Sequence, residues 1–144
     1  MILRLSGRRG LPRVDRALLR RRAGALLRAL DQAGAELSLH LADDAEIAAL
    51  NARYRGVARP TDVLSFSLLE GESSAHRGAL LGDVVIGVET AARQARRARR
   101  SLDAELLRLL IHGVLHLLGH DHLRAPEARA MRALERRLRR EVAE

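Results

Sequence analysis

Histidines are concentrated between positions 112 and 122 of the chain, where four of its six occur. His112 and His116 are four residues apart, so a helix places their rings on one face, where they can bind a single metal ion. Gly119 can end that helix in a left-handed conformation, which brings the following residues back toward the pair. His122 can then complete a three-histidine zinc site with one position open to water, the arrangement typical of catalytic zinc.

Two neighbouring residues extend this candidate site. Asp121 is suited to hydrogen-bond a metal-binding imidazole from outside the coordination sphere. His120 is an alternative third ligand or a proton relay. The helix that carries the histidines is expected to bury one apolar stripe and to point the histidines to its other side, together with Glu105 and Arg108. The residues of that stripe are Leu107, Leu110, Ile111, Val114 and Leu118.

The spacing H-x-x-x-H-x-x-G-x-x-H also occurs in the metzincin proteases, where a glutamate follows the first histidine and acts as the general base. This chain has Gly113 at that position. Peptide hydrolysis would lack its proton acceptor, so a zinc metallopeptidase is the second interpretation. The whole segment at residues 112–122, H-G-V-L-H-L-L-G-H-D-H, instead resembles the signature of the YbeY family.

Further segments resemble the same family. Residues 50–56 read L-N-A-R-Y-R-G, residues 59–66 read R-P-T-D-V-L-S-F, and residues 81–86 read L-G-D-V-V-I. By this resemblance, Arg55 matches the arginine that the family places near its metal. Ser67 stands where the family usually has proline, which affects how a strand ends and leaves the candidate site residues unchanged.

The resemblance implies a single-strand-specific, metal-dependent endoribonuclease with one Zn²⁺ per chain. It implies action in 16S rRNA 3′-end maturation and in ribosome quality control. The implied partners are single-stranded RNA, ribosomal RNA and components of the small ribosomal subunit. The implied catalytic residues are Arg55, His112, His116 and His122, of which the three histidines bind the metal.

The expected chemistry depends on the metal. Three neutral histidines leave zinc its full charge, which lowers the pKa of bound water to about 7 and provides hydroxide as the nucleophile. Arg55 can meet the charge that develops on the phosphodiester with two parallel hydrogen bonds. The general base is open, because Asp62 and Asp83 qualify only if the fold brings them to the metal. A third interpretation is a ribosome-assembly factor that binds RNA through arginines and uses zinc only to fold.

Composition narrows the class of protein. The 144 residues predict one domain, 1–144, and the net charge of +8 favours a polyanionic partner such as RNA. The absence of cysteine and of a long apolar run predicts a cytoplasmic protein without a membrane span. The only aromatic residues are Tyr54 and Phe66, which predicts weak base stacking and a substrate held mainly by its phosphates.

The apolar patterning predicts four strands and about five helices. We expect an α+β fold with a mixed four-stranded sheet and the histidine-bearing helix on one face, which is similar to the zincin-like metal-dependent hydrolases. The arginine-rich start of the chain resembles a transit peptide in composition, but it is interpreted as a strand and a helix of the domain. His40, which alternates with leucines, is expected on the polar face of its strand. Strands are expected at 1–6, 36–42, 62–67 and 80–88, and helices at 13–33, 43–53, 89–100, 101–118 and 126–140.

Overall fold

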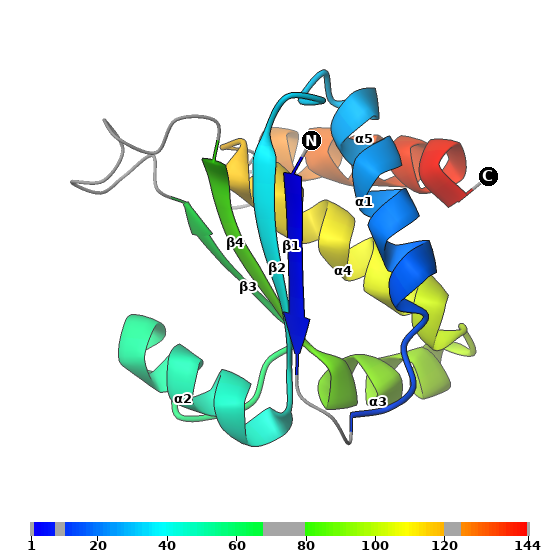
Figure 1. Ribbon diagram of the computed structural model, residues 1–144. Coiled ribbons are helices and arrows are strands. Elements are labelled where there is room, and N and C mark those ends of the chain that lie inside the picture. The colour runs from blue at the N-terminus through cyan, green and yellow to red at the C-terminus, as the bar shows by residue number, and fades with distance from the viewer. Residues whose placement is uncertain (1, 8–10, 68–79, 120–124, 144) are drawn as a thin grey trace.

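The computed structural model describes residues 2–7, 11–67, 80–119 and 125–143, which form four strands and five helices (Figure 1). This content confirms the predicted α+β class. The strands are β1 (Ile2–Gly7), β2 (Glu36–Ala42), β3 (Val63–Ser67) and β4 (Leu80–Gly87). The helices are α1 (Arg16–Ala29), α2 (Asp44–Arg55), α3 (Val88–Ala98), α4 (Leu102–Leu117) and α5 (Ala125–Ala143).

The four strands form one mixed sheet in the order β1-β2-β4-β3. β1 pairs with β2, and β2 with β4, in parallel, whereas β3 runs antiparallel to β4. The sheet is therefore mixed, as predicted. β3 is one of its two edge strands, and its outer edge is not paired with another described strand.

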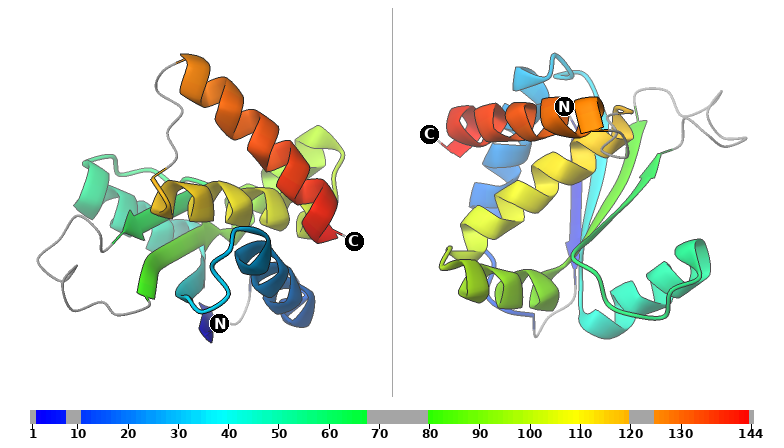
Figure 2. Two further views of the ribbon diagram at one scale, coloured as in Figure 1. Left: turned by 90° about the horizontal axis from the view of Figure 1, so that it is seen from above. Right: turned by 180° about the vertical axis from the view of Figure 1, so that it is seen from behind.

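The two faces of the sheet differ in their cover. Leu39 of β2 is fully buried, and its register partner Val84 lies directly beneath Gly113 of α4. Helices α1, α4 and α5 lie on this side of the sheet, whereas α2 lies on the other (Figures 1 and 2). His40 points to that other face, as expected, and hydrogen-bonds Ser6 Oγ through Nδ1 at 2.6 Å. The face beneath α4 therefore holds the main core.

Several helix ends differ from the sequence prediction: α3 ends at Ala98 rather than at 100, and α5 continues to Ala143 rather than to 140. α1 is shorter than 13–33, because the Asp15 side chain caps it by accepting a hydrogen bond from Leu18 N, and Asp31 beyond its end has a left-handed φ of 58°. α2 is longer than predicted and reaches Arg55, where Gly56 ends it in a left-handed conformation with a φ of 72°. This extension places Tyr54 and Arg55 in the last turn of α2. No helix in the described ranges is long and apolar enough to cross a membrane.

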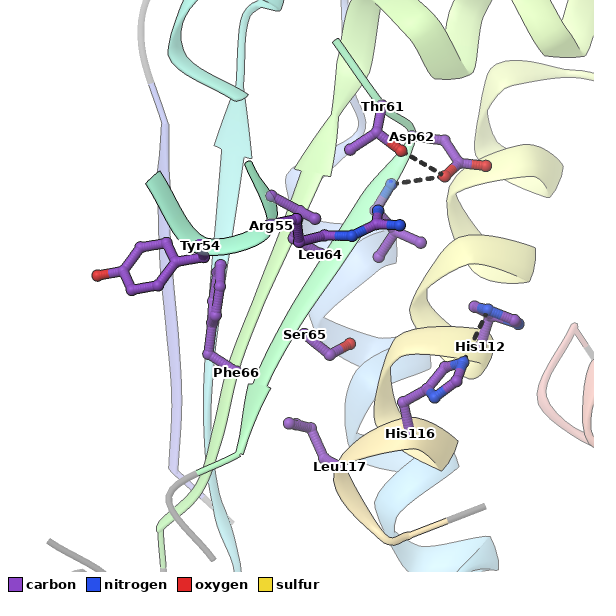
Figure 3. Close-up of a pocket in the computed structure, with 11 residues that line it drawn as sticks. Tyr54, Arg55, Thr61, Asp62, Leu64, Ser65, Phe66, His112, His116 and Leu117 are labelled. Carbon is purple, nitrogen blue, oxygen red and sulfur yellow. Dashed lines mark hydrogen bonds between the residues drawn. The ribbon is translucent and has the colours of Figure 1, made fainter. Parts of the chain in front are cut away.

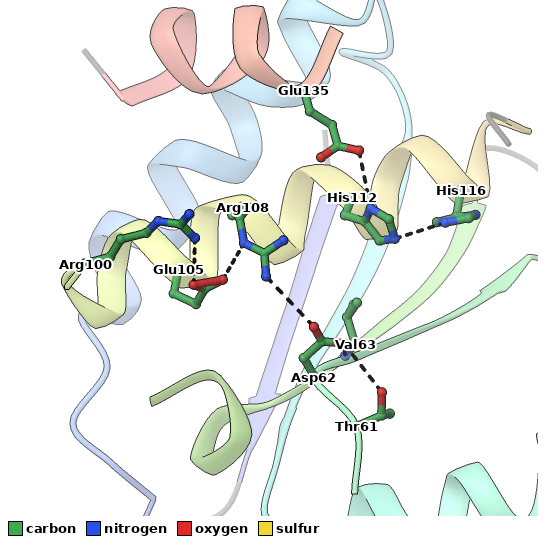
Figure 4. Close-up of polar contacts among 9 residues, drawn as sticks. All are labelled: Thr61, Asp62, Val63, Arg100, Glu105, Arg108, His112, His116 and Glu135. Carbon is green, nitrogen blue, oxygen red and sulfur yellow. Dashed lines mark hydrogen bonds and ion pairs between the residues drawn. The ribbon is translucent and has the colours of Figure 1, made fainter. Parts of the chain in front are cut away.

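Glu105 is more deeply buried than its side of α4 suggested. The helical pattern placed it on the exposed side with the histidines, but its side chain is only 1% exposed. Arg100 donates to Glu105 Oε2 at 3.1 Å, and Arg108 donates to Oε1 (Figure 4). A buried carboxylate is tolerated when it is paired in this way. Arg108 also lies 4.0 Å from Asp62, which connects the buried acid to the loop before β3.

Replacing Glu105 by glutamine tests how much this pairing contributes to the free energy of unfolding. Glu105→Gln keeps the side-chain volume, but it removes the charge and turns one acceptor toward the arginines into a donor. We expect the free energy of unfolding to fall by about 2 kcal/mol in urea titrations. The matched control is Glu141→Gln, which breaks the exposed pair with Arg137 and should cost less than about 0.5 kcal/mol. Equal losses in the two variants would contradict the structural role given to Glu105.

Candidate metal centre

Helix α4 brings two of the predicted ligands together. Ser101 caps its start by accepting a hydrogen bond from Ala104 N at 3.1 Å. At the other end, Gly119 has a left-handed φ of 90°, and its N–H donates to His116 O at 3.0 Å. The helix therefore contains the whole interval from His112 to His116, and the chain turns at the glycine that was expected to end it.

The two imidazoles converge through their Nε2 atoms. These atoms lie 3.1 Å apart, and the ring centroids of His112 and His116 are 4.6 Å apart. Two nitrogens bound to one tetrahedral zinc ion, each at about 2.1 Å from the metal, lie about 3.4 Å from one another. The observed separation is close to that value. The pair therefore has the chemistry and the spacing to hold one metal ion.

Glu135 of α5 contacts the first of these histidines. Its Oε1 atom lies 3.4 Å from His112 Nδ1 (Figure 4). The hydrogen bond from His112 is the main reason why the pKa of Glu135 is lower than usual; burial opposes this shift, while the charges of His112, Arg108 and Arg139 add to it. The ionised carboxylate can only accept hydrogen bonds, so in the neutral form of His112, the form that can bind a metal, Nδ1 carries the proton and Nε2 presents its lone pair.

Sequence reasoning missed Glu135, although a signal for it exists. The expected inner face of the last helix contained Met131, Leu134 and Leu138. Glu135 lies between Met131 and Leu138 at spacings of four and three residues, so it shares their stripe. An acid on an apolar stripe needs a partner. What the sequence did not reveal was that this partner would be a histidine of α4.

An open pocket of about 760 Å³ lies in front of the histidines. Arg55 of α2 lines it together with His112 and His116, and Figure 3 shows the Arg55 side chain extending across β3 toward α4. The structure thus places the arginine that was selected by resemblance beside the predicted metal ligands. The other lining residues are Tyr54, Thr61, Asp62, Val63, Leu64, Ser65, Phe66 and Leu117.

Of the two aspartates considered as a general base, only Asp62 lines this pocket. Its Oδ1 atom accepts a hydrogen bond from Val63 N at 2.8 Å, while Oδ2 faces Arg108 at 4.0 Å. Asp83 is the register partner of Phe66, one residue out of phase with Val84, and therefore lies on the face of the sheet opposite to α4. The fold does not bring Asp83 to the histidines.

The predicted third ligand His122, its alternative His120, and Asp121 lie outside the described residues. Within the ranges that the structure covers, no group of three or more histidine or acidic side chains converges in a way that could hold a metal. The described part of the site thus consists of His112 and His116 with Glu135 behind them. The role of His122 stays a prediction.

Gly113 bears on the peptidase interpretation. Its carbonyl oxygen accepts a hydrogen bond from Ser65 Oγ at 3.0 Å, and a Cβ atom added to it would lie 2.8 Å from Val84 Cγ1. The helix packs so closely on the sheet here that a glutamate side chain has no space. Among the described lining residues the one carboxylate belongs to Asp62, which approaches from the loop before β3. The general base of a metzincin is therefore missing from its usual position.

The chain is similar to known proteins in its sequence and in its fold. The family Endoribonuclease YbeY matches residues 14–143. Endoribonuclease YbeY of Anaeromyxobacter sp. (strain Fw109-5) is 51% identical over 140 residues, covering 97% of this chain and 71% of that protein. Endoribonuclease YbeY of Anaeromyxobacter dehalogenans is 52% identical to this chain over 122 residues, which cover 85% of this chain and 62% of that protein. The solution structure of TM1509 from Thermotoga maritima has a TM-score of 0.68 at 28% identity, covering 98% of this chain and 89% of that one.

Proposed function

The chain belongs to the endoribonuclease YbeY family, and we propose that it is a zinc-dependent endoribonuclease that cuts single-stranded RNA. The observation that carries this proposal is the 3.1 Å separation of the two Nε2 atoms in a pocket that Arg55 also lines. A metal-binding pair beside a guanidinium suits the hydrolysis of a phosphodiester. Because the chain spans 71% and 62% of the two relatives named above, their full activity is part of the proposal.

Each residue of the pocket has a proposed task. His112 and His116 hold the metal with His122 as the third ligand, and Glu135 keeps His112 in the tautomer that binds. When bound, zinc supplies the activation of water near neutral pH. Arg55 binds the phosphate with two parallel hydrogen bonds, and these strengthen as negative charge develops on its oxygens. Asp62, held toward the pocket by Val63 N and Arg108, is the proposed proton acceptor.

The proposed target is ribosomal RNA. The net charge of +8 favours a polyanionic partner. The family resemblance supports action near the 3′ end of 16S rRNA, in ribosome quality control, with small-subunit components as partners and in the cytoplasm. Zinc is the proposed metal because imidazole ligands suit it and because the family resemblance implies one Zn²⁺ per chain.

A substrate panel tests this proposal. One RNA sequence is offered to the purified protein single-stranded and annealed to its complement, first after metal removal and then with zinc restored. We expect cleavage of the single strand alone, and only with metal present. Equal cleavage of the duplex would contradict the substrate class, and undiminished cleavage after metal removal would contradict the mechanism.

The role of Glu135 has a separate test. Glu135→Gln removes the ionised acceptor that fixes His112, and we expect zinc affinity to fall about 10- to 100-fold. The measurement is competition for zinc against a chromogenic chelator. Glu141→Gln is the matched control, because it removes a charge from the exposed end of the same helix, and it should leave the affinity unchanged. If both variants bind zinc as tightly as the parent protein, Glu135 does not orient a ligand.

A further inference from the structure

The only two aromatic residues of the chain meet in the candidate pocket. Tyr54 comes from the last turn of α2 and Phe66 from β3, and their ring centroids lie 4.7 Å apart. Both line the pocket that contains the histidines. Tyr54 is 56% exposed and is the one large hydrophobic side chain exposed among the described residues. The Arg53 guanidinium carbon lies 5.4 Å from the centre of its ring.

The pocket extends around the edge of the sheet that β3 forms. Ser65 faces α4, where it hydrogen-bonds the Gly113 carbonyl, and Phe66, the next residue of β3, faces the opposite side. Figure 3 shows Tyr54 and Phe66 on one side of β3 and the two histidines on the other. Arg55 lies between these two groups. A chain bound across this edge can thus contact the aromatic pair and the histidine pair together.

We propose that the exposed Tyr54 ring, supported by its contact with Phe66 at an interplanar angle of 54°, is a stacking platform for one unpaired base of the RNA, next to the phosphate that Arg55 binds. This inference rests on the proposed function and explains its preference for single strands. A base in a duplex is paired and stacked within the helix, whereas an unpaired base can turn out and stack on an aromatic ring. The low aromatic content predicted weak stacking for the chain as a whole, but the fold concentrates both rings where one base is needed.

The alternative is that the pair only attaches α2 to the sheet. Phe66 does pack against the small cluster of Ala42, Ile47, Leu64 and Val85, so its substitution would affect stability as well as any binding. Tyr54 contributes little to that cluster, since more than half of its surface is exposed. Substitutions of Tyr54 therefore separate the two roles.

The experiment compares Tyr54→Leu with Tyr54→Phe in the zinc-loaded protein. The substrates are single-stranded RNAs in which one abasic nucleotide is moved stepwise along the chain, and the readout is kcat/KM. For the parent protein and Tyr54→Phe, we expect one abasic position to lower kcat/KM about tenfold. For Tyr54→Leu, the intact RNA should already be cut about tenfold more slowly, and the abasic substitution should add no further loss.

Two results would overturn the platform. One is that no abasic position affects the parent protein, and the other is that the same abasic loss persists in Tyr54→Leu. Neither result would contradict the proposed nuclease activity, because the intact RNA would still be cut. If the parent protein cuts no RNA, the proposed function fails. In that case the platform is tested by equilibrium binding of the same abasic RNAs. It is overturned if no abasic position weakens binding to the parent protein, or if the same weakening persists in Tyr54→Leu.

Discussion

His116→Ala is expected to lower metal-dependent cleavage of single-stranded RNA about 10³-fold or more, which corresponds to at least about 4 kcal/mol of transition-state stabilisation. The substitution removes one of the two nitrogens that lie 3.1 Å apart. An ion held by the remaining ligands would bind weakly and would lose its position relative to Arg55. The measurement is the single-turnover rate on a labelled oligonucleotide at saturating protein.

The matched control for this variant is His40→Ala. His40 lies on the opposite face of the sheet, hydrogen-bonded to Ser6 and Glu46, and it should be dispensable for cleavage. Circular dichroism checks that both variants fold. If His116→Ala retains RNA binding and biological activity and loses only thermal stability, the zinc is structural. The chain would then be an assembly factor rather than a nuclease.

Arg55→Ala is expected to lower kcat about 10²- to 10³-fold, the usual loss when a preorganised donor to a developing oxyanion is removed. Arg55→Lys should recover only part of this loss, because an ammonium keeps the charge but lacks the planar fork that makes two parallel hydrogen bonds. The measurement is kcat and KM on the same oligonucleotide with zinc present.

Arg97→Ala is the comparison for Arg55, since it removes an exposed arginine from α3, whose side chain does not line the pocket. It lowers the net charge equally and should leave kcat unchanged. If Arg55→Ala changes only KM, and to the same degree as Arg97→Ala, then Arg55 contributes general attraction for RNA. In that case it has no specific place at the reacting phosphate.

The elements that carry the candidate metal site were predictable because local signals determine them. The interval from Ser101 to Gly119 has a capping residue, acids in its first turn and a terminating glycine, and the structure has a helix with these limits. The alternation of leucines around His40 likewise identified β2. The spacing of His112 and His116 then sufficed to bring their rings together, since a helix fixes the positions of residues four apart.

The missed features depend on contacts between distant parts of the chain. Glu105 was expected on the side of the helix opposite its apolar stripe, and the helical pattern does not show that Arg100 and Arg108 enclose it there. Glu135 belongs to a different helix from its partner His112, and only the packing of α5 on α4 brings them together. A sequence pattern shows which side of a helix is apolar. It does not identify the polar side chain that will pair with a charged residue buried in the fold.

The pairing of Tyr54 with Phe66 is a further example of this limit. Composition showed only that the chain has two aromatic residues. Their contact depends on α2 reaching Arg55, two residues beyond its predicted end, and on β3 lying at the edge of the sheet. Both depend on how the chain folds as a whole, and both decide what the pocket can bind.

Elemental analysis of the purified protein tests the central claim most directly. We predict one zinc ion per chain in the parent protein and in His40→Ala, and a loss of zinc in each of His112→Ala, His116→Ala and His122→Ala. A parent protein that takes up no metal when zinc is supplied would contradict the account. So would full zinc content in the three histidine variants of the candidate site.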